Sequence, residues 1–509
     1  MTIPMPRSRP TFYRLAALLV IFALGLAVAA PAAGQVAPTR AYSSFLGGAS
    51  DDDARAVAVD ALGNFYVAGT TYSLPFPGTV GERNDTNAFV AKLDPTGAHV
   101  LYSVVVGGSS DEEGLALAVD AQGNAWLAGY TRSDDLPLKN AISTTFNGDD
   151  DTFVTKLGPG GGLLMQTYLG ESGTDQANAL AVDAQGNAYL AGSAAADFGP
   201  VVMVKKIKAN GSGLAYQAFF GRAERGFAKG SRAHGVAVDA QGNAYIAGET
   251  NTGGMELDGF QKQCAGYDNP IDDCPSDDGF VAVLNPAGNA IIGGTLLGGL
   301  AGDVATSVAL DAGRNVYVAG TTFSTDFPTK NPWQAQKRGP DNFADAFVVK
   351  LPPLALTLSY GTYYGGEEYD EAYGVAVGAN GRAYLTGLTS SSDLPVPGAF
   401  QPAIKGICVT GSTERYCYDG FVAGFGPSGA LGWASYIGGS DDDLGRGVAA
   451  RANGDVYVVG RAASFGLPTT PGAFQPGKAG SDDAFVVRVS TAAGSPQLGK
   501  RIFVPLARR

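Results

Sequence analysis

Histidine, cysteine and positive charge are scarce in this chain of 509 residues, which has two histidines, four cysteines and 35 lysines and arginines. With so few histidines, neither a His-rich metal site nor catalysis that uses imidazole as a general base is expected. The 48 aspartates and glutamates give a net charge of −13. Nucleic acid is therefore not expected as a partner, because phosphate binding needs a basic surface. The sequence also lacks the Gly-x-Ser-x-Gly, HExxH and P-loop motifs of common enzymes.

Long apolar runs are missing too, apart from one at the start of the chain. Arg7 and Arg9 precede an apolar run over 15–30, and small residues follow it up to Gly34. This pattern predicts a secretory signal peptide over residues 1–34. An uncleaved anchor is the alternative, but a helix of this run would span only ~24 Å of a hydrocarbon core ~30 Å thick. The mature chain is then expected to have no transmembrane segment and to be secreted or held at the cell surface.

The four cysteines form two close pairs, Cys264 with Cys274 and Cys408 with Cys417. An exported chain can oxidise such pairs. Four cysteines allow three connectivities, and the placement of each pair in one loop of the repeat described below favours two local disulfides. A zinc site is the alternative, although neither pair has the short spacing of a zinc knuckle.

Glycine is abundant, with 73 residues, and it belongs to a unit that recurs seven times. In each copy an apolar strand ends in Asp, a turn with Gly and Asn follows, and an aromatic strand ends in Gly. The Asp position of the copies falls at Asp60, Asp120, Asp183, Asp239, Asp311, Gly378 and Arg451. Each unit is expected to contain four strands, which we name a to d. Strand c has the alternation seen at 151–157 and 345–351, and strand d runs into glycines.

The strand count predicts how the chain closes. Only six d strands follow the seven a, b and c sets, and the seventh d strand lies at the other end of the chain, in Tyr42–Gly48. The two ends are therefore expected to pair and close a ring. This predicts an all-β fold, a seven-bladed β-propeller of four-stranded blades over residues 35–490, closed by the N-terminal strand. Residues 491–509 form a C-terminal tail to which the sequence assigns no role.

The repeated motifs resemble the bacterial SBBP β-propeller repeat. The resemblance rests on the Val-Ala-Val-Asp-x-x-Gly-Asn core, the Tyr-x-x-Phe-Leu-Gly-Gly end, the Thr-x-Ser-x-Asp-Phe-Pro type of loop and the Asp-Ala-Phe-Val-x-Lys-Leu strand, and it covers about residues 42–489. It implies a seven-bladed propeller on an exported bacterial protein, and it implies no established activity.

Acidic residues concentrate between strands d and a, a region that we expect to be a loop. Carboxylates in Gly-rich loops suit Ca²⁺, so the runs Asp51, Asp52, Asp53 and Asp441, Asp442, Asp443 are candidate calcium ligands. The alternative is that they only keep the surface solvated. No other cofactor is expected.

One of these connections is basic instead. It contains Arg222, Arg225, Lys229, Arg232 and His234, which together could bind a carboxylate or sulfate group. Pairing with the neighbouring acidic loops is the alternative. The recurring Lys and Asp of strand c are expected to build the blades rather than to bind a ligand.

Taken together, these features predict an exported, monomeric, non-catalytic scaffold that binds a protein or glycan through loops on one face. The alternative function is a glycan-active hydrolase or lyase that uses carboxylates at the mouth of the central channel. The sequence names neither the ligand nor a catalytic pair, so it leaves enzymatic activity undecided.

Overall fold

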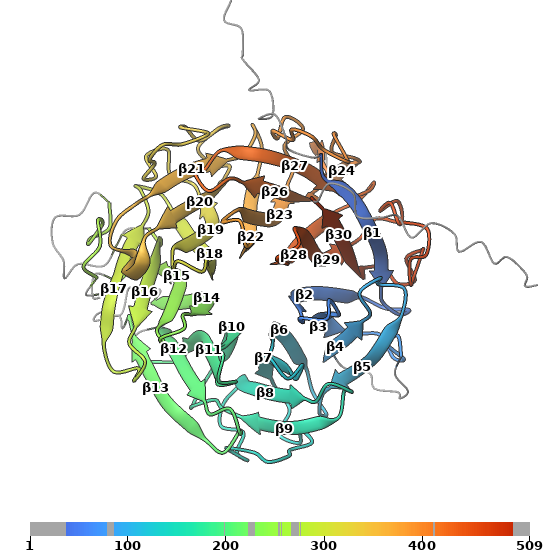
Figure 1. Cartoon of the computed structure of the whole chain (residues 1–509), viewed down its shortest axis with the longest axis vertical. Coiled ribbons are helices and arrows are strands. Elements are labelled where there is room, and N and C mark those ends of the chain that lie inside the picture. Colours follow the sequence, from blue (N-terminus) through green and yellow to red (C-terminus); the bar gives the residue numbers. More distant parts are fainter. Residues whose placement is uncertain are drawn as a thin grey trace, which may run out of the picture. The chain divides into compact units, whose positions relative to one another are not determined.

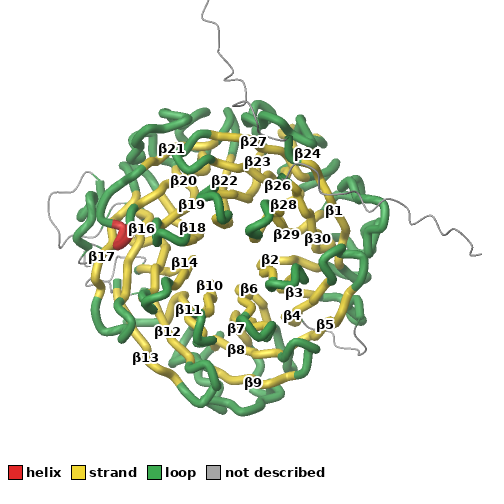
Figure 2. The backbone as a smooth tube through the Cα atoms, in the orientation of Figure 1, coloured by secondary structure: helices red, strands yellow, loops and turns green. Residues whose placement is uncertain are grey.

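The computed structural model describes residues 37–78, 86–197, 199–221, 230–252, 255, 257–265, 274, 276–410 and 413–491. Within these residues, seven four-stranded antiparallel sheets follow one another around a ring, and one two-stranded hairpin is added (Figure 1). Figure 2 shows that strands and loops make up almost all of the ring. The fold is the seven-bladed β-propeller that the repeat predicts.

Blades 1 to 6 use their strands in chain order, from the inner strand a to the outer strand d. Blade 1 has β2 (Asp52–Val59), β3 (Phe65–Thr71), β4 (Asn87–Leu93) and β5 (Val100–Val106). Blade 2 has β6 (Glu112–Val119), β7 (Ala125–Thr131), β8 (Asp151–Leu157) and β9 (Leu163–Tyr168). Blade 3 has β10 (Gln176–Val182), β11 (Ala188–Ala194), β12 (Val201–Ile207) and β13 (Leu214–Phe220). Blade 4 has β14 (Ser231–Val238), β15 (Ala244–Thr250), β16 (Asp278–Leu284) and β17 (Ile291–Leu297).

The remaining blades carry the additions to the plan. Blade 5 has β18 (Asp303–Leu310), β19 (Val316–Thr322), β20 (Asp345–Leu351) and β21 (Tyr360–Tyr364), with the 3-10 turn η1 (Pro353–Ala355). Blade 6 has β22 (Asp370–Val377), β23 (Ala383–Thr389), β26 (Asp419–Phe425) and β27 (Leu431–Ile437), and its b–c loop holds the hairpin of β24 (Ile407–Thr410) and β25 (Thr413–Tyr416). Blade 7 has β28 (Asp443–Ala450), β29 (Asp455–Ala462), β30 (Asp483–Ser490) and β1 (Thr39–Leu46).

The ring closes as predicted. Strand β1 pairs antiparallel with β30, from Thr39 opposite Ser490 to Leu46 opposite Ala484. The first strand of the chain is thus the outer strand d of the last blade. It covers the edge of β30 that would otherwise be exposed.

The core lies between the blades. The b strands are buried along almost their whole length, as in β3 and β19, because both of their faces meet a neighbouring blade. Aromatic residues of these strands, such as Trp126 and Tyr317, are fully buried. The inner strands carry small residues, such as Ala54, Ala233 and Ala305, where the ring narrows.

The a–b turns explain the recurring Asp-x-x-Gly-Asn. In blade 1, Gly63 has a φ of 91°, a conformation that glycine adopts without strain. Asp60 accepts a hydrogen bond of 2.9 Å from the backbone N–H of Asn64 and another of 2.8 Å from its side-chain amide. In blade 5 the left-handed residue is Arg314, with a φ of 63°.

The structure corrects where the inner strands begin. Asp52, Asp53 and Asp443 were expected in d–a loops, but they open β2 and β28. Arg232 and His234 likewise belong to β14 and not to a loop. The inner strand begins before its first apolar residue, because the acid at its start is buried and hydrogen-bonded inside the blade. None of the helices in the described part of the chain is long and apolar enough to cross a membrane.

Candidate binding face

The d–a connections and the b–c loops meet on one edge of the ring, which we call the loop face. In an antiparallel meander these connections share one end of the blade, and the short a–b and c–d turns share the other. In blade 1 the two loops are bonded together: the N–H of Tyr72 donates to the carbonyl of Asp51 at 2.9 Å. The N–H of Ser50 donates to the hydroxyl of Ser73, also at 2.9 Å. In blade 1 the two loops of this face are therefore joined to each other by hydrogen bonds.

A pocket of about 200 Å³ opens in the loop face where blades 7, 1 and 2 meet. Its walls are formed by Asp51, Asp52, Asp53, Arg55, Thr70, Tyr72, Glu113, Arg461 and Asp482. Three of the predicted calcium ligands thus share one pocket with two arginines. The ring of Tyr72 is 55% exposed beside them.

Ion pairs join most of the charges in this pocket. Arg55 lies 3.2 Å from Asp53 and 3.1 Å from Glu113, so it links the inner strands of two blades. Arg461 lies 3.0 Å from Asp482. Carboxylates accept hydrogen bonds and guanidinium groups donate them. The pocket can therefore both accept hydrogen bonds from ligand hydroxyl or amide groups and donate hydrogen bonds to them.

Asp52 forms the back of the pocket and serves the fold. Its oxygens accept hydrogen bonds from the N–H of Gly48 at 2.7 Å, from Thr71 at 2.5 Å and from Ser73 at 2.8 Å. Burial raises the pKa of Asp52 to about 6, although these hydrogen bonds oppose the shift. Asp51 accepts from the hydroxyl of Ser481 at 2.5 Å. The calcium assignment for this run stays a prediction.

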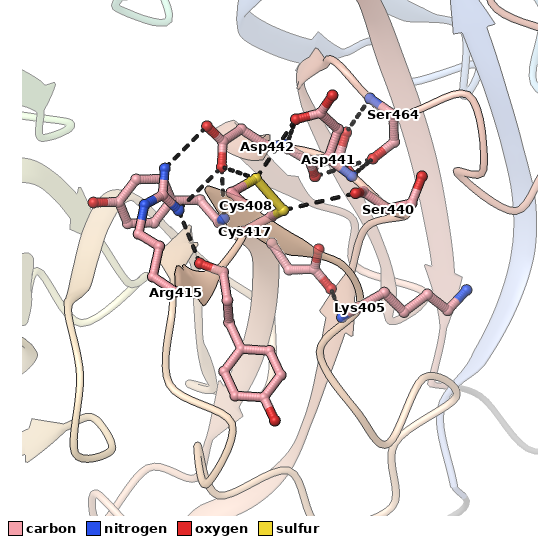
Figure 3. Close-up of a disulfide and its surroundings, with 12 residues drawn as sticks. Lys405, Cys408, Arg415, Cys417, Ser440, Asp441, Asp442 and Ser464 are labelled. Carbon is pink, nitrogen blue, oxygen red and sulfur yellow. Dashed lines mark hydrogen bonds and ion pairs between the residues drawn. A yellow bond between two sulfur atoms is a disulfide. The ribbon is translucent and has the colours of Figure 1, made fainter. Parts of the chain in front are cut away.

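The second acidic run lies against a disulfide (Figure 3). Cys408 and Cys417 are bonded, with their Cα atoms 4.9 Å apart, at the base of the β24–β25 hairpin. Asp442 holds this hairpin by an ion pair of 3.2 Å with Arg415 and by accepting the N–H of Tyr418 at 2.8 Å. Because the bonded sulfurs are not thiolates, they are not zinc ligands in this state.

Asp443, the third member of that run, is buried in blade 7. It accepts hydrogen bonds from the N–H of Gly439 at 2.6 Å and from the hydroxyl of Ser464 at 2.6 Å. Burial raises its pKa to about 6. Asp443, like Asp52, is thus a predicted calcium ligand whose carboxylate forms hydrogen bonds inside the blade. Calcium binding at 441–443 also stays a prediction.

The β24–β25 hairpin presents apolar side chains to solvent. Ile407 is 54% exposed, Val409 is 64% exposed and Tyr416 is 40% exposed. Ile407 pairs with Tyr416 across the hairpin, and Val409 follows two residues after Ile407, so all three lie on one face of the hairpin. Sequence reasoning identified the disulfide but missed this apolar face, because the b–c loop gave no strand signal.

The basic connection of blade 4 is described only in part. Arg222, Arg225 and Lys229 lie outside the described residues. Arg232 and His234 both approach Glu249, at 3.4 Å and 3.6 Å. Burial acts to raise the pKa of Glu249, but the nearby His234 and the guanidinium group of Arg232 outweigh burial and lower it. The anion site stays a prediction, with two of its five residues already paired to an acid.

The other predicted disulfide is also present. Cys264 and Cys274 are bonded, with their Cα atoms 5.8 Å apart, in the b–c loop of blade 4. The N–H of Cys274 donates to the carbonyl of Asn251 at 2.7 Å. Both local pairings that the cysteine spacing favoured are confirmed.

The fold and the loop face define a seven-bladed β-propeller built from a repeat. Residues 167–199, which run from the outer strand of blade 2 through strands a and b of blade 3, match the SBBP family model, described as a beta-propeller repeat. The predicted SBBP resemblance is thereby confirmed.

One curated protein and several solved structures are similar to the chain. The regulatory protein FlaEY of Caulobacter vibrioides is 25% identical over 409 residues, which are 76% of this chain and 39% of that protein. The chain therefore spans about two fifths of that relative's length. Sqt1 of Chaetomium thermophilum is 14% identical with a TM-score of 0.39, over 89% of this chain and 98% of its own. A PL25 ulvan lyase is 10% identical with a TM-score of 0.42, over 88% and 95%. At these scores the structures carry no inference about function.

Proposed function

We propose that this protein is an exported, monomeric β-propeller that binds a protein or glycan partner through its loop face. The hairpin β24–β25 would make the main contact. The observation that carries the proposal is the exposure of Ile407, Val409 and Tyr416 on a hairpin stapled by a disulfide. Burying an apolar side chain of this size contributes roughly 1.5–3 kcal/mol, and a rigid element loses little entropy when it binds.

The pocket of blades 7, 1 and 2 would supply polar specificity on the same face. Its carboxylates and guanidinium groups suit hydroxyl and amide groups, and the exposed ring of Tyr72 offers a stacking surface. This combination fits a sugar residue or a polar loop of a protein. The paired charges Arg55, Asp53 and Glu113 would exchange part of their mutual contacts for contacts with the ligand.

Export is supported by two features of the chain. The apolar run over 15–30 after a basic start is typical of a signal peptide. The two disulfides are typical of proteins outside the cytoplasm. The relative FlaEY is named a regulatory protein, which fits a binding role rather than a catalytic one.

Site-specific cross-linking in the producing cells tests the proposal. A photo-activatable benzoylphenylalanine replaces Val409 in one variant and Leu62 in the control. Leu62 is 80% exposed and lies in an a–b turn, on the opposite edge of the ring. We expect one discrete adduct at position 409 outside the cytoplasm and none at position 62. Absence of an adduct at 409, or the same adducts at both positions, would refute binding by the loop face.

A further inference from the structure

A backbone hydrogen bond of the same kind joins every pair of neighbouring blades. The donor is the backbone N–H of the residue at, or just before, the start of strand a. The acceptor is the carbonyl of the residue just before strand c of the preceding blade. In blades 5 and 6, for example, Asp370 donates to Ala344 at 2.9 Å, and in blades 6 and 7 Asp443 donates to Tyr418 at 2.6 Å. The side chain of the inner residue is thereby placed beside the first side chain of strand c.

Acids occupy both of these positions at most junctions. Five of the seven junctions hold such a pair. Two of them include the candidate calcium ligands Asp52 and Asp443 and are left aside. The other three pairs are Asp151 with Asp175, Asp278 with Asp303 and Asp345 with Asp370. All six side chains are 0% exposed. At the third pair, a Cβ placed on Gly365 would lie 2.5 Å from Cγ of Asp345, so the backbone closes tightly over the acids.

Hydrogen-bond donors reach only part of each pair. Oδ2 of Asp345 accepts from the amide of Gln334 at 2.8 Å and from the N–H of Arg338 at 3.0 Å, but its Oδ1 meets no donor. Oδ2 of Asp370 accepts from Gly366 at 2.7 Å and from Ser391 at 2.8 Å. Oδ1 of Asp151 is also without a donor. A buried oxygen in this state costs free energy unless a proton or a cation satisfies it.

The charges around the pairs do not balance two carboxylates. Lys205 acts on the first pair. Lys337 and Arg338 act on Asp345, but Arg338 also pairs with Asp393 at 3.8 Å. Further acids, Asp277 and Asp326, act on the second pair. Lys205 already pairs with Glu171 at 3.0 Å. The environment therefore favours one negative charge per pair rather than two.

Two junctions of the same ring carry a natural substitution of the pair. Between blades 1 and 2 the positions hold Asn87 and Glu112, and between blades 3 and 4 they hold Val201 and Ser231. An amide beside a carboxylate has the same net charge as an acid beside a carboxylate, and it likewise donates a hydrogen bond to the carboxylate. The junction therefore accepts a neutral residue in place of one acid. Valine cannot bind a metal ion, so the position held by Val201 does not require a metal ligand.

We propose that each of the three acid pairs keeps one proton in the folded protein, so that an acid–carboxylate hydrogen bond seals the junction and alkaline pH loosens the ring. The proton lies between the strand c acid of one blade and the inner acid of the next. At the third pair the donors to both Oδ2 atoms remain in place, because a carboxylate oxygen accepts their hydrogen bonds.

The pKa values agree with this assignment. Burial, followed by the charge of the partner acid, raises the pKa of Asp278 to about 8, and burial raises that of Asp303 to about 6. Burial raises the pKa of Asp345 to about 7. Since these pKa values lie above those of the unfolded chain, the stabilisation is complete below about pH 4 and is lost as pH rises through 6 to 8.

A triple variant with Asp151→Asn, Asp278→Asn and Asp345→Asn, one substitution in each pair, tests the proposal in the full chain. Asparagine repeats the arrangement of Asn87 and leaves no proton to lose. We expect the Tm of the unchanged protein to fall by several degrees between pH 5 and pH 9. The triple variant should show a clearly smaller fall in Tm between these pH values and should be the more stable protein at pH 9. Asp134→Asn, at an exposed acid of the same face, is the control and should behave as the unchanged protein.

Infrared spectroscopy at pH 7 gives a second readout that does not depend on stability. The unchanged protein should show the C=O stretching band of protonated carboxylic acids, which should be weaker in the triple variant and unchanged in the control. The single variants replace the triple variant if it does not fold. Absence of the band together with a constant Tm would overturn the proposal. So would a calcium-dependent rise in Tm at pH 8 that the Asn variants lack, because a cation would then occupy the pairs.

Discussion

At the scale of single residues, one polar unit recurs in the blades and connects three elements. In blade 2, Lys156 lies 3.6 Å from Asp120 and 4.4 Å from the centre of the Trp126 ring. Its Nζ also donates to the carbonyl of Ala209 in blade 3, at 3.1 Å. The same lysine of strand c contacts the turn aspartate and the b-strand ring in other blades. These contacts agree with the prediction that the lysine of strand c helps to build the blade.

Replacing Lys156 with methionine should destabilise the protein by about 1–3 kcal/mol, because it leaves the buried Asp120 without its cation. Denaturant unfolding measures this change. Lys262→Met is the matched control, since the pair of Lys262 and Asp258 has side chains that are 61% and 89% exposed. Equal effects of the two substitutions would contradict a structural role for Lys156.

At the scale of elements, the sequence predicted strands well where they alternate and poorly where a buried acid starts them. The c strands begin at Asp151, Asp345 and Asp483, as expected. The inner strands begin at acids such as Asp52, which look like loop residues because carboxylates are seldom buried. Only the hydrogen bonds across a junction reveal their role.

The candidate site was predictable in part for a related reason. Local features, such as the disulfide of Cys408 and Cys417 or the acidic run at Asp51, are visible in the sequence. The pocket is not, because Arg55, Glu113 and Arg461 come from three blades. Their proximity depends on the angle between blades, which no local pattern encodes.

The disulfide of the β24–β25 hairpin should matter for local order and little for the ring. Replacing Cys408 and Cys417 with serine should remove at most roughly 3 kcal/mol of loop-closure stabilisation, because the bond closes a short loop. Limited proteolysis should then cut within 407–416, while the Tm changes by only a few degrees. Resistance of this variant to proteolysis equal to that of the unchanged protein would show that the hairpin needs no staple.

At the scale of the whole molecule, every assignment of faces depends on how the ring closes. Strand β1 covers β30, and Tyr42 and Leu46 enter the same apolar cluster as Phe65 and Tyr457. Two sets of interactions thus hold the last junction. One is the hydrogen bonding within the sheet of blade 7, and the other is the apolar packing between blade 7 and blade 1. An exposed β30 would be an edge open to other chains.

Hydrogen–deuterium exchange of this closure tests the account most directly. Amides of residues 39–46 should exchange as slowly as those of residues 483–490 in the full chain. In a chain that begins at Gly48, the 483–490 amides should exchange much faster and the protein should associate through the open edge. Rapid exchange of residues 39–46 in the full chain, with residues 483–490 still protected, would contradict a ring that is closed by its first strand.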